Sequence, residues 1–300
     1  MTDGQETEAA PDIGERIPSQ AASKPYQMRR LSYAGTFTNP VKAGAIRTIE
    51  WMTGKLHLIR LIRQFERTGV PIGQPFFTKA VRTMGIDILT PEEQVARIPR
   101  TGSVVVVANH PHGLVDGLVM GELVGRVRTD YKILTRSLLT GIPEIEHHML
   151  PVPFPHENNA RELSLQMRNT CMTHLKDGGV IILFPAGRVA TTKGFFGPAI
   201  EPEWNPFTAK MVMRSGAMVL PIFFPGQNTR LYHVADKLSA TFRQGLLLHE
   251  IYRALYKPQA PVIGRPIQQE ELRNWASDPR GMLAWLRKTT LALGEAGGAV

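Results

Sequence analysis

The sequence predicts an α/β protein with a mostly parallel sheet flanked by helices and preceded by an N-terminal helical segment. Short apolar runs of strand length recur along the chain, at 104–108, 131–135, 180–184 and 218–224. Stretches with helical length separate these runs, and strands that alternate with helices favour a parallel sheet with helices on its faces.

We expect the chain to divide into three parts. Residues 1–25 are acidic and polar with few large apolar side chains, a composition typical of disorder. Residues 26–84 are expected to form an N-terminal helical segment that could associate with a membrane. Residues 85–300 are expected to form the α/β domain, because the alternating strands and helices lie there.

Residues 41–67 are predicted to be helical, with a break near Thr53 and Gly54. After the break, apolar and basic side chains separate onto opposite helix faces. The apolar face holds Leu58, Leu61, Ile62 and Phe65, and the basic face holds Arg60, Arg63 and Arg67. Two interpretations stay open: the helix lies in a lipid headgroup layer, with 58–65 reaching the acyl boundary, or it packs on its own domain.

The remaining elements follow from local patterns. A helix is expected near 76–81, a strand at 86–89, and a helix that begins at Thr90 and Pro91. The further expected elements are helices at 114–124, just after 136, at 159–176, at 206–214 and at 269–294, an extended stretch at 151–155, and an edge strand at 262–264.

Composition narrows the class of partner. A formal net charge of +9 and a pI near 9.8 imply attraction to nucleic acid, a lipid surface or an acidic substrate. Nucleic acid is the weakest of these, because aromatic content is 7% and no zinc-finger, RRM-type or P-loop pattern occurs. Cys171 is the single cysteine, which excludes an internal disulfide, and its helical setting favours a buried structural thiol. No apolar run has transmembrane length, and the acidic start is unlike a secretory signal.

A dense polar cluster, Asn-His-Pro-His-Gly, follows the strand 104–108. In open α/β sheets, sites are built at the carboxyl ends of strands, and a carboxylate beside an imidazole fixes its tautomer for acid–base work. If the next helix begins early, His112 and Asp116 face each other at i and i+4. If it begins near Gly113, His110 ends the strand and Asp116 returns in the first turn. Pro111 favours the second case, in which His110 pairs with Asp116, but from the residues alone either His110 or His112 could be the base.

Basic residues follow two other strands. Arg136 follows the second strand, and Arg188 follows the third, close to Lys193. Parallel strands would bring them near the His/Asp pair, where an arginine fork matches phosphate or carboxylate. A surface charge, or a partner for a carboxylate, is the alternative.

Three motifs in order resemble the glycerolipid acyltransferases, the lysophospholipid acyltransferase superfamily, over residues 85–265. They are Asn109-His110 with a downstream Asp, Phe184-Pro185-x-Gly187, and Val219-Leu220-Pro221-Ile222. The Asn-His-Pro-x-Gly-x-x-Asp-Gly form is similar to a bacterial haemolysin-labelled branch, which includes or adjoins enzymes that acylate ornithine-type and other lyso-lipids.

Two departures from the family pattern stand out. His110 and Asp116 are separated by one residue more than is usual. The block Phe-Pro-Glu-Gly-Thr-Arg appears as Phe184-Pro185-Ala186-Gly187-Arg188, so the acidic residue is missing and the arginine comes one position early. The second departure weighs against a glycerol-phosphate acceptor.

The resemblance implies acyl transfer from acyl-CoA or acyl-ACP to the hydroxyl of a lyso-lipid or glycerol-phosphate-type acceptor. It implies that His110 is the general base and that Asp116 is its carboxylate partner, with Asn109 and His112 as possible supporting residues around them. Gly187 belongs to the substrate-binding block with Arg188. We expect no bound cofactor, no metal and no nucleic acid, and a peripheral place at the cytoplasmic face of a bacterial membrane. Because no Gly-x-Ser-x-Gly elbow occurs, direct attack by the acceptor oxygen is favoured.

Two other functions remain open. His110-x-His112-x-x-x-Asp116 resembles metal-ligand spacing, and His147, His148 and His156 could complete a metal-dependent hydrolase. A metal site is disfavoured because no His or Asp cluster follows any of the later predicted strands. The third possible function is a non-catalytic module that binds a lipid surface, which the net charge and the predicted helix 41–67 suggest.

Overall fold

The computed structural model describes residues 31–32, 34, 39–135, 139, 141–153, 159–195 and 197–297. Within them, six strands form a sheet in the order β3-β2-β4-β1-β5-β6. All neighbouring pairs are parallel except β5 and β6. The predicted mostly parallel α/β architecture is therefore confirmed. The strands are β1 (Val104–Ala108), β2 (Tyr131–Thr135), β3 (Met149–Pro151), β4 (Val180–Leu183), β5 (Met218–Phe223) and β6 (Val262–Ile263).

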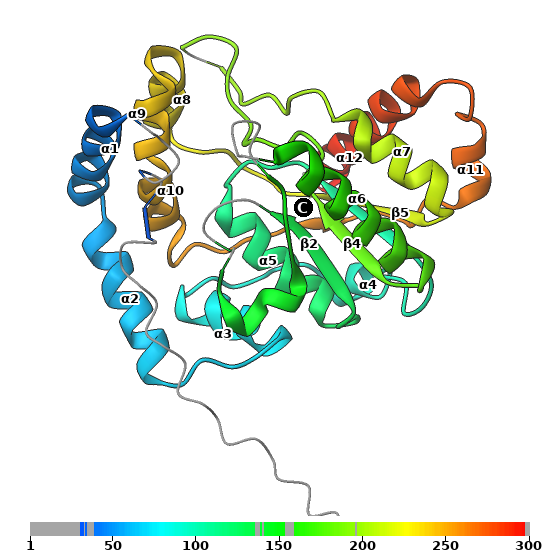
Figure 1. The fold of residues 1–300 in the computed structure, drawn as a ribbon, viewed down its shortest axis with the longest axis horizontal. Coiled ribbons are helices and arrows are strands. Elements are labelled where there is room, and N and C mark those ends of the chain that lie inside the picture. The colour runs from blue at the N-terminus through cyan, green and yellow to red at the C-terminus, as the bar shows by residue number, and fades with distance from the viewer. Residues whose placement is uncertain are drawn as a thin grey trace, which may run out of the picture.

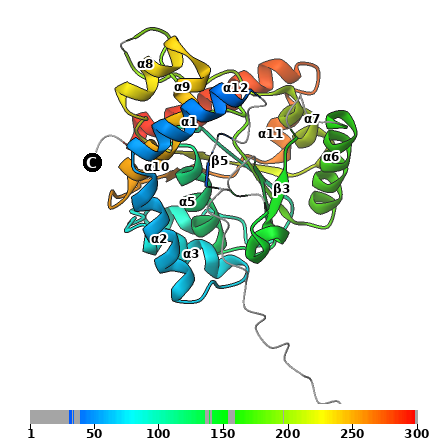
Figure 2. The same ribbon diagram turned by 60° about the vertical axis from the view of Figure 1, so that its left-hand side comes forward.

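Helices cover both faces of this sheet (Figures 1 and 2). Residues from α2, α3, α5 and α10 share a core with one face, and residues from α6, α7, α11 and α12 share a core with the other. The helices are α1 (Pro40–Met52), α2 (Lys55–Arg67), α3 (Gln74–Thr83), α4 (Glu92–Val95), α5 (Leu114–Gly125), α6 (Ala160–Lys176), α7 (Pro206–Ser215), α8 (Arg230–Leu238), α9 (Ala240–Gly245), α10 (Leu247–Ala254), α11 (Gln269–Arg273) and α12 (Pro279–Gly297), with a 3₁₀ helix η4 (Pro143–His148).

Strand β1 occupies the centre of the sheet. Its side chains alternate between the two cores: Val104, Val106 and Ala108 join one, and Val105 and Val107 join the other. The chain leaves β1 toward β2, β3 and β4 on one side and later reaches β5 on the other. The carboxyl end of β1 therefore lies where the strand order reverses, the usual place for a ligand site in an open α/β sheet.

Helix α5, which follows β1, is buried on nearly every side. Gly121 lets α3 approach closely, because a Cβ at this position would lie 2.4 Å from the nearest ring atom of Phe77. A helix that is apolar over most of its surface is typical of a place between layers rather than at the protein surface. Helix α5 gives the residues at its first turn a rigid support.

The break predicted near Thr53 and Gly54 is confirmed, and α1 and α2 meet there. Gly54 takes a positive φ of 115°, which a side chain would disfavour. Across the break, the buried ammonium of Lys55 lies 3.1 Å from the carboxylate of Glu50. Helix α1 packs on α9, and α2 packs on α10 and α3.

The apolar face of α2 packs on its own domain. Leu58 is buried, and Leu61, Ile62 and Phe65 pack against the same core as α3 and α5. The expectation that the 58–65 face reaches the acyl boundary of a membrane is therefore wrong. An amphipathic pattern shows that one face is covered, not what covers it. Among the described residues, no helix has both the length and the apolar character to cross a bilayer.

Several local predictions also need correction. The strand expected at 86–89 is absent from the described residues, where only Ile88 forms a bridge, with Gln259. Thr90 does not cap α4: its hydroxyl donates to the carbonyl of Pro261, and the helix begins one residue later than expected. The terminal helix is divided into α11 and α12, and β3, α8, α9 and α10 were not foreseen.

Some predictions fall outside the described residues. They include the disordered 1–25 segment, Arg136 with most of the short helix after it, and the latter part of the 151–155 stretch. The prediction for Cys171 is confirmed, because its thiol is fully buried 3.7 Å from the sulfur of Met167. Burial raises the pKa of this thiol to about 12, which makes it a poor nucleophile.

Candidate active site

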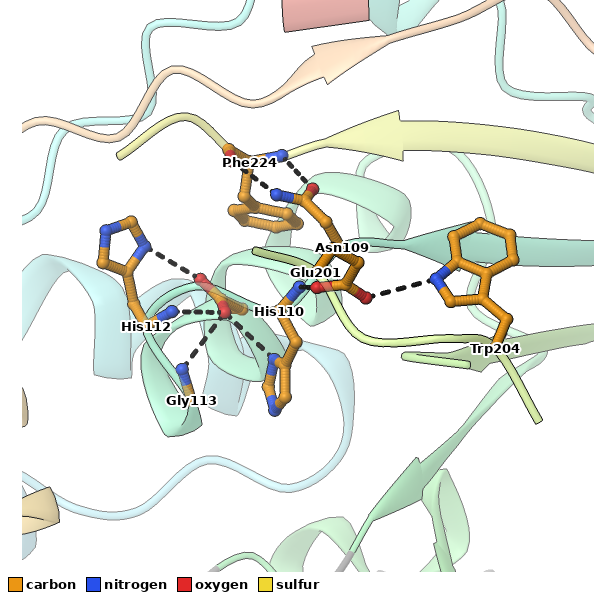
Figure 3. Close-up of polar contacts among 8 residues, drawn as sticks. Asn109, His110, His112, Gly113, Glu201, Trp204 and Phe224 are labelled. Atoms are coloured by element: carbon orange, nitrogen blue, oxygen red, sulfur yellow. Dashed lines mark hydrogen bonds and ion pairs between the residues drawn. The ribbon is translucent and has the colours of Figure 1, made fainter. Parts of the chain in front are cut away.

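Asn109, the first residue after β1, ties this strand to the end of β5. Its amide nitrogen donates to the carbonyl of Phe224 at 2.8 Å, and its amide oxygen accepts the Phe224 N–H at 2.7 Å. Both backbone groups of Phe224 are satisfied by one buried side chain, so the position of the next residue, His110, is well defined (Figure 3).

His110 is held at its ring and at both ends of its backbone. Its ring stacks on Phe184, the residue that follows β4, with 4.0 Å between ring centroids. Its carbonyl accepts the N–H of Ala190 at 2.9 Å, and its N–H donates to the carboxylate of Glu201 at 3.1 Å. The carboxyl ends of β1, β4 and β5 thus meet at this histidine.

Asp116 is the fully buried centre of the cluster. One carboxylate oxygen lies 3.0 Å from Nδ1 of His110 and accepts the N–H groups of His112 and Gly113 at 2.8 and 3.1 Å. The other oxygen lies 3.1 Å from Nδ1 of His112. Asp116 stands in the first turn of α5, where the helix dipole also favours a negative charge.

The single helix start that the structure shows allows both imidazoles to contact Asp116. The helix begins at Leu114, the later of the two alternatives, yet His112 reaches Asp116 as well as His110 does. The two imidazole rings differ in the residue that lies next to each ring, apart from Asp116. His110 stacks on Phe184, whereas Nε2 of His112 would lie 3.0 Å from a Cβ placed on Gly226.

The charges of the cluster depend on one another. Burial would raise the pKa of Asp116, but hydrogen bonds from His110 and His112 outweigh it and the net pKa is lowered. Burial would lower the pKa of His112, but the hydrogen bond and charge of Asp116 outweigh it and the net pKa is raised. Asp116 is therefore ionised at neutral pH, with two imidazoles to stabilise it.

The predicted binding residues lie on the loop after β4. Gly187 takes a φ of 65° in the turn there, a conformation that favours glycine. Arg188 and Lys193 are exposed, and neither hydrogen-bonds to His110 or Asp116 within the described residues. The loop is still attached to the site, because Ala190 donates to the His110 carbonyl.

The histidines suggested as further metal ligands lie elsewhere. His148 stacks on Tyr131 and its Nδ1 lies 3.0 Å from the Tyr131 carbonyl, at the start of β2. Because β2 runs parallel to β4, and β4 parallel to β1, His148 lies at the amino ends of the strands, whereas His110 lies at their carboxyl ends. His156 lies outside the described residues. No group of three potential metal ligands occurs in the part of the chain that the structure describes.

The sequence did not point to Glu201 or Trp204. Glu201 is buried beside His110, and its second carboxylate oxygen accepts the indole N–H of Trp204 at 3.2 Å. Burial raises the pKa of Glu201, and the hydrogen bonds from His110 and Trp204 oppose this effect. Glu201 lies 91 positions after His110 in the sequence, and no local spacing reveals the contact.

This chain is similar to two curated relatives and to one solved structure. Lyso-glycine lipid O-acyltransferases of Phocaeicola vulgatus and Bacteroides thetaiotaomicron are 24% and 22% identical over 177 and 180 residues. The matched parts cover 57% and 58% of this chain, but only 61% and 64% of those relatives. The crystal structure of the 1-acyl-sn-glycerophosphate (LPA) acyltransferase PlsC from Thermotoga maritima is 14% identical and covers 87% of this chain and 90% of its own, with a TM-score of 0.49.

A family model described as "Acyltransferase" matches residues 46–295, which include all three sequence motifs and the His110–Asp116 contact. This match extends over most of the described fold, from the helices before the sheet to α12. The chain belongs to this acyltransferase family.

Proposed function

We propose that this chain transfers an acyl group from a thioester donor to the hydroxyl of a lyso-lipid, with His110 as general base. One observation carries the proposal. In a chain of the acyltransferase family, Nδ1 of an imidazole at the end of the central strand lies 3.0 Å from a fully buried carboxylate.

The chemistry follows from this contact. With its proton on Nδ1 and shared with Asp116, the ring of His110 presents an unprotonated Nε2. Nε2 takes the proton of the acceptor hydroxyl while the oxygen attacks the thioester carbonyl. The C–S bond then breaks, the ester forms, and the imidazolium returns its proton to the leaving thiolate. Asp116 stabilises the imidazolium between these two transfers.

The substrates are proposed from chemistry and from the relatives. The donor is acyl-CoA or acyl-ACP, which both present a thioester behind a phosphate-bearing arm. The acceptor is a lyso-lipid with an amino-acid headgroup, as the names of the two relatives suggest. Ala186 stands where the family block is acidic, which weighs against a glycerol-phosphate acceptor. Arg188 and Lys193, exposed on the loop joined to His110, are the proposed contacts for the anionic groups of these substrates, with Arg136.

We further propose a peripheral position at the cytoplasmic membrane face. Support comes from the exposed sides of α1 and α2 rather than from the buried 58–65 face. Trp51 and Met52 are 54% and 81% exposed, and Val41 and Leu56 are also exposed. Exposed basic side chains on the same two helices are Lys42, Arg47, Arg60, Arg63 and Arg67. Apolar and basic groups together suit the surface of an anionic bilayer.

The test is thioester-dependent thiol release with a panel of lyso-lipids that carry glycine, ornithine or phosphate headgroups. His110→Ala should lower kcat by about 10²-fold or more, the usual contribution of a general base. Its melting temperature should stay close to that of the unaltered protein. His112→Ala is the matched control, since it removes the other imidazole that contacts Asp116.

The outcome separates the remaining functions. Full activity of His110→Ala, together with loss of activity in His112→Ala, would show that His112 is the base and that the proposal is wrong. No thiol release by the unaltered protein with any acceptor, together with binding to lipid vesicles, would favour a non-catalytic lipid-surface module.

A further inference from the structure

Glu201 is a buried carboxylate that the proposed reaction does not use. It is 4% exposed, and each of its oxygens accepts one N–H group: that of the His110 backbone at 3.1 Å and that of the Trp204 indole at 3.2 Å. Its own carbonyl accepts a hydrogen bond from the guanidinium of Arg287 on α12. An ionisable group buried at this depth is costly unless its contacts compensate, so its place beside His110 needs an explanation.

The loop after β4 brings Glu201 to this place. The loop leaves the site where Ala190 donates to the His110 carbonyl, and Thr191 and Ile200 then pair as antiparallel neighbours. It returns where the N–H of Asn205 donates to the carbonyl of Pro185 at 2.9 Å. Between these two attachments the loop places the Glu201 carboxylate against the backbone N–H of His110.

We propose that Glu201 is a positioning residue, which holds the general base His110 through its backbone N–H. This inference rests on the proposed role of His110. Glu201 fixes the N–H side of the His110 backbone and Ala190 fixes the carbonyl side. Stacking on Phe184 and the contact with Asp116 then leave the ring one orientation.

Replacement by glutamine gives a specific prediction. A glutamine side chain has one oxygen and one NH₂ group where Glu201 has two oxygens. Whichever way it is turned, its NH₂ group faces an N–H donor, either that of His110 or that of Trp204. The bond to His110 is therefore lost or weakened in Glu201→Gln. Removal of the indole N–H by Trp204→Phe takes away the competing donor and lets the glutamine oxygen turn to His110.

The experiment measures kcat and KM for both substrates in Glu201→Gln, Trp204→Phe and the double variant. We expect Glu201→Gln to lower kcat by ~10- to ~10²-fold, because small misplacement of a reacting group is costly. KM for donor and acceptor should change less than about two-fold, since Glu201 is proposed to touch neither. Trp204→Phe alone should have little effect, and the double variant should recover kcat to within about five-fold of the unaltered protein.

Matched controls separate positioning from general stability. Glu122→Gln makes the same change at a partly buried carboxylate of α5 that bonds to Thr78 and Gln74, away from His110. It should keep kcat. Melting temperatures show whether any loss follows the folded fraction.

The inference is overturned if Glu201→Gln keeps full kcat while His110→Ala is inactive, which would leave the proposed function intact. It is also overturned if the loss appears in KM, follows the melting temperature, or is not relieved by Trp204→Phe. Full activity of His110→Ala would instead refute the proposed base.

Discussion

Asp116 contacts Nδ1 of both His110 and His112, and its hydrogen bond and charge together raise the pKa of His112 despite burial. A histidine whose folded-state pKa lies above the unfolded value stabilises the protein at pH values below that unfolded value. This contribution is lost as the pH rises through the folded-state pKa. His112 should therefore add stability in mildly acidic solution and little in basic solution.

His112→Asn tests this expectation at the scale of one residue. The difference in melting temperature between the unaltered protein and the variant should be largest near about pH 6, below the ordinary histidine pKa of about 6.5. It should shrink steadily toward about pH 9, where the imidazole is neutral. In an Asp116→Asn background, the same substitution should lose this pH dependence. A difference that grows with pH would show that His112 is neutral in the folded protein.

Residues close together in sequence could be predicted, and residues joined by the fold could not. Asn109, His110, His112 and Asp116 lie within one strand–turn–helix segment, so their chemistry was visible in the sequence. Which imidazole contacts Asp116 was not, because both do. Glu201 reaches His110 only because the loop after β4 folds back, and that path depends on backbone hydrogen bonds that have no sequence pattern.

At the scale of elements, the contact between α5 and α3 depends on one glycine. A Cβ on Gly121 would lie 2.4 to 2.8 Å from three ring atoms of Phe77. Phe77 is fully buried and packs edge-on against Phe76, Tyr131 and His148, so its ring has no room to move. We expect Gly121→Ala to reduce the free energy of unfolding by about 1–3 kcal/mol, as overpacking does.

Gly44→Ala is the matched control for this prediction. Gly44 also lies within a helix, α1, but nothing stands within 4 Å of a Cβ placed on it. Alanine there should raise the free energy of unfolding by about 0.5–1 kcal/mol, since it has the higher helix propensity. Denaturant unfolding of both variants measures the contrast. Equal stability of the two would mean that α5 and α3 can separate without cost.

Element prediction succeeded where a pattern has one structural meaning. The apolar runs predicted β1, β4 and β5, because buried central strands are apolar on both faces. Strand β2, which was also predicted, mixes buried and half-buried residues. The face of α2 at 58–65 had two meanings, lipid or core, and periodicity alone does not separate them. Helices α8 to α10 were missed because they are short and follow one another with few capping signals.

At the scale of the whole molecule, the net charge of +9 remains to be explained by a partner. Helices α1 and α2 lie together at one side of the molecule (Figure 1), and their exposed surfaces carry both basic and large apolar side chains. Each basic residue near an anionic lipid surface contributes about 1 kcal/mol, within a Debye length of the surface. A few such residues can hold a protein at a membrane reversibly, and salt should weaken that attraction.

The final prediction concerns this surface. Trp51→Glu/Met52→Glu should weaken co-sedimentation with anionic vesicles by about ten-fold, because it removes two exposed apolar groups and adds two negative charges. The fold should persist, since both side chains are more than half exposed. Leu165→Glu is the matched control: Leu165 is 53% exposed and belongs to α6, which lies on the side away from α2 in Figure 2, so its replacement should change binding little. By contrast, Leu61→Glu/Phe65→Glu should lower the melting temperature, because that face packs on the core. Equal binding of the unaltered protein to neutral and anionic vesicles, or undiminished binding of Trp51→Glu/Met52→Glu, would show that the charge serves another partner.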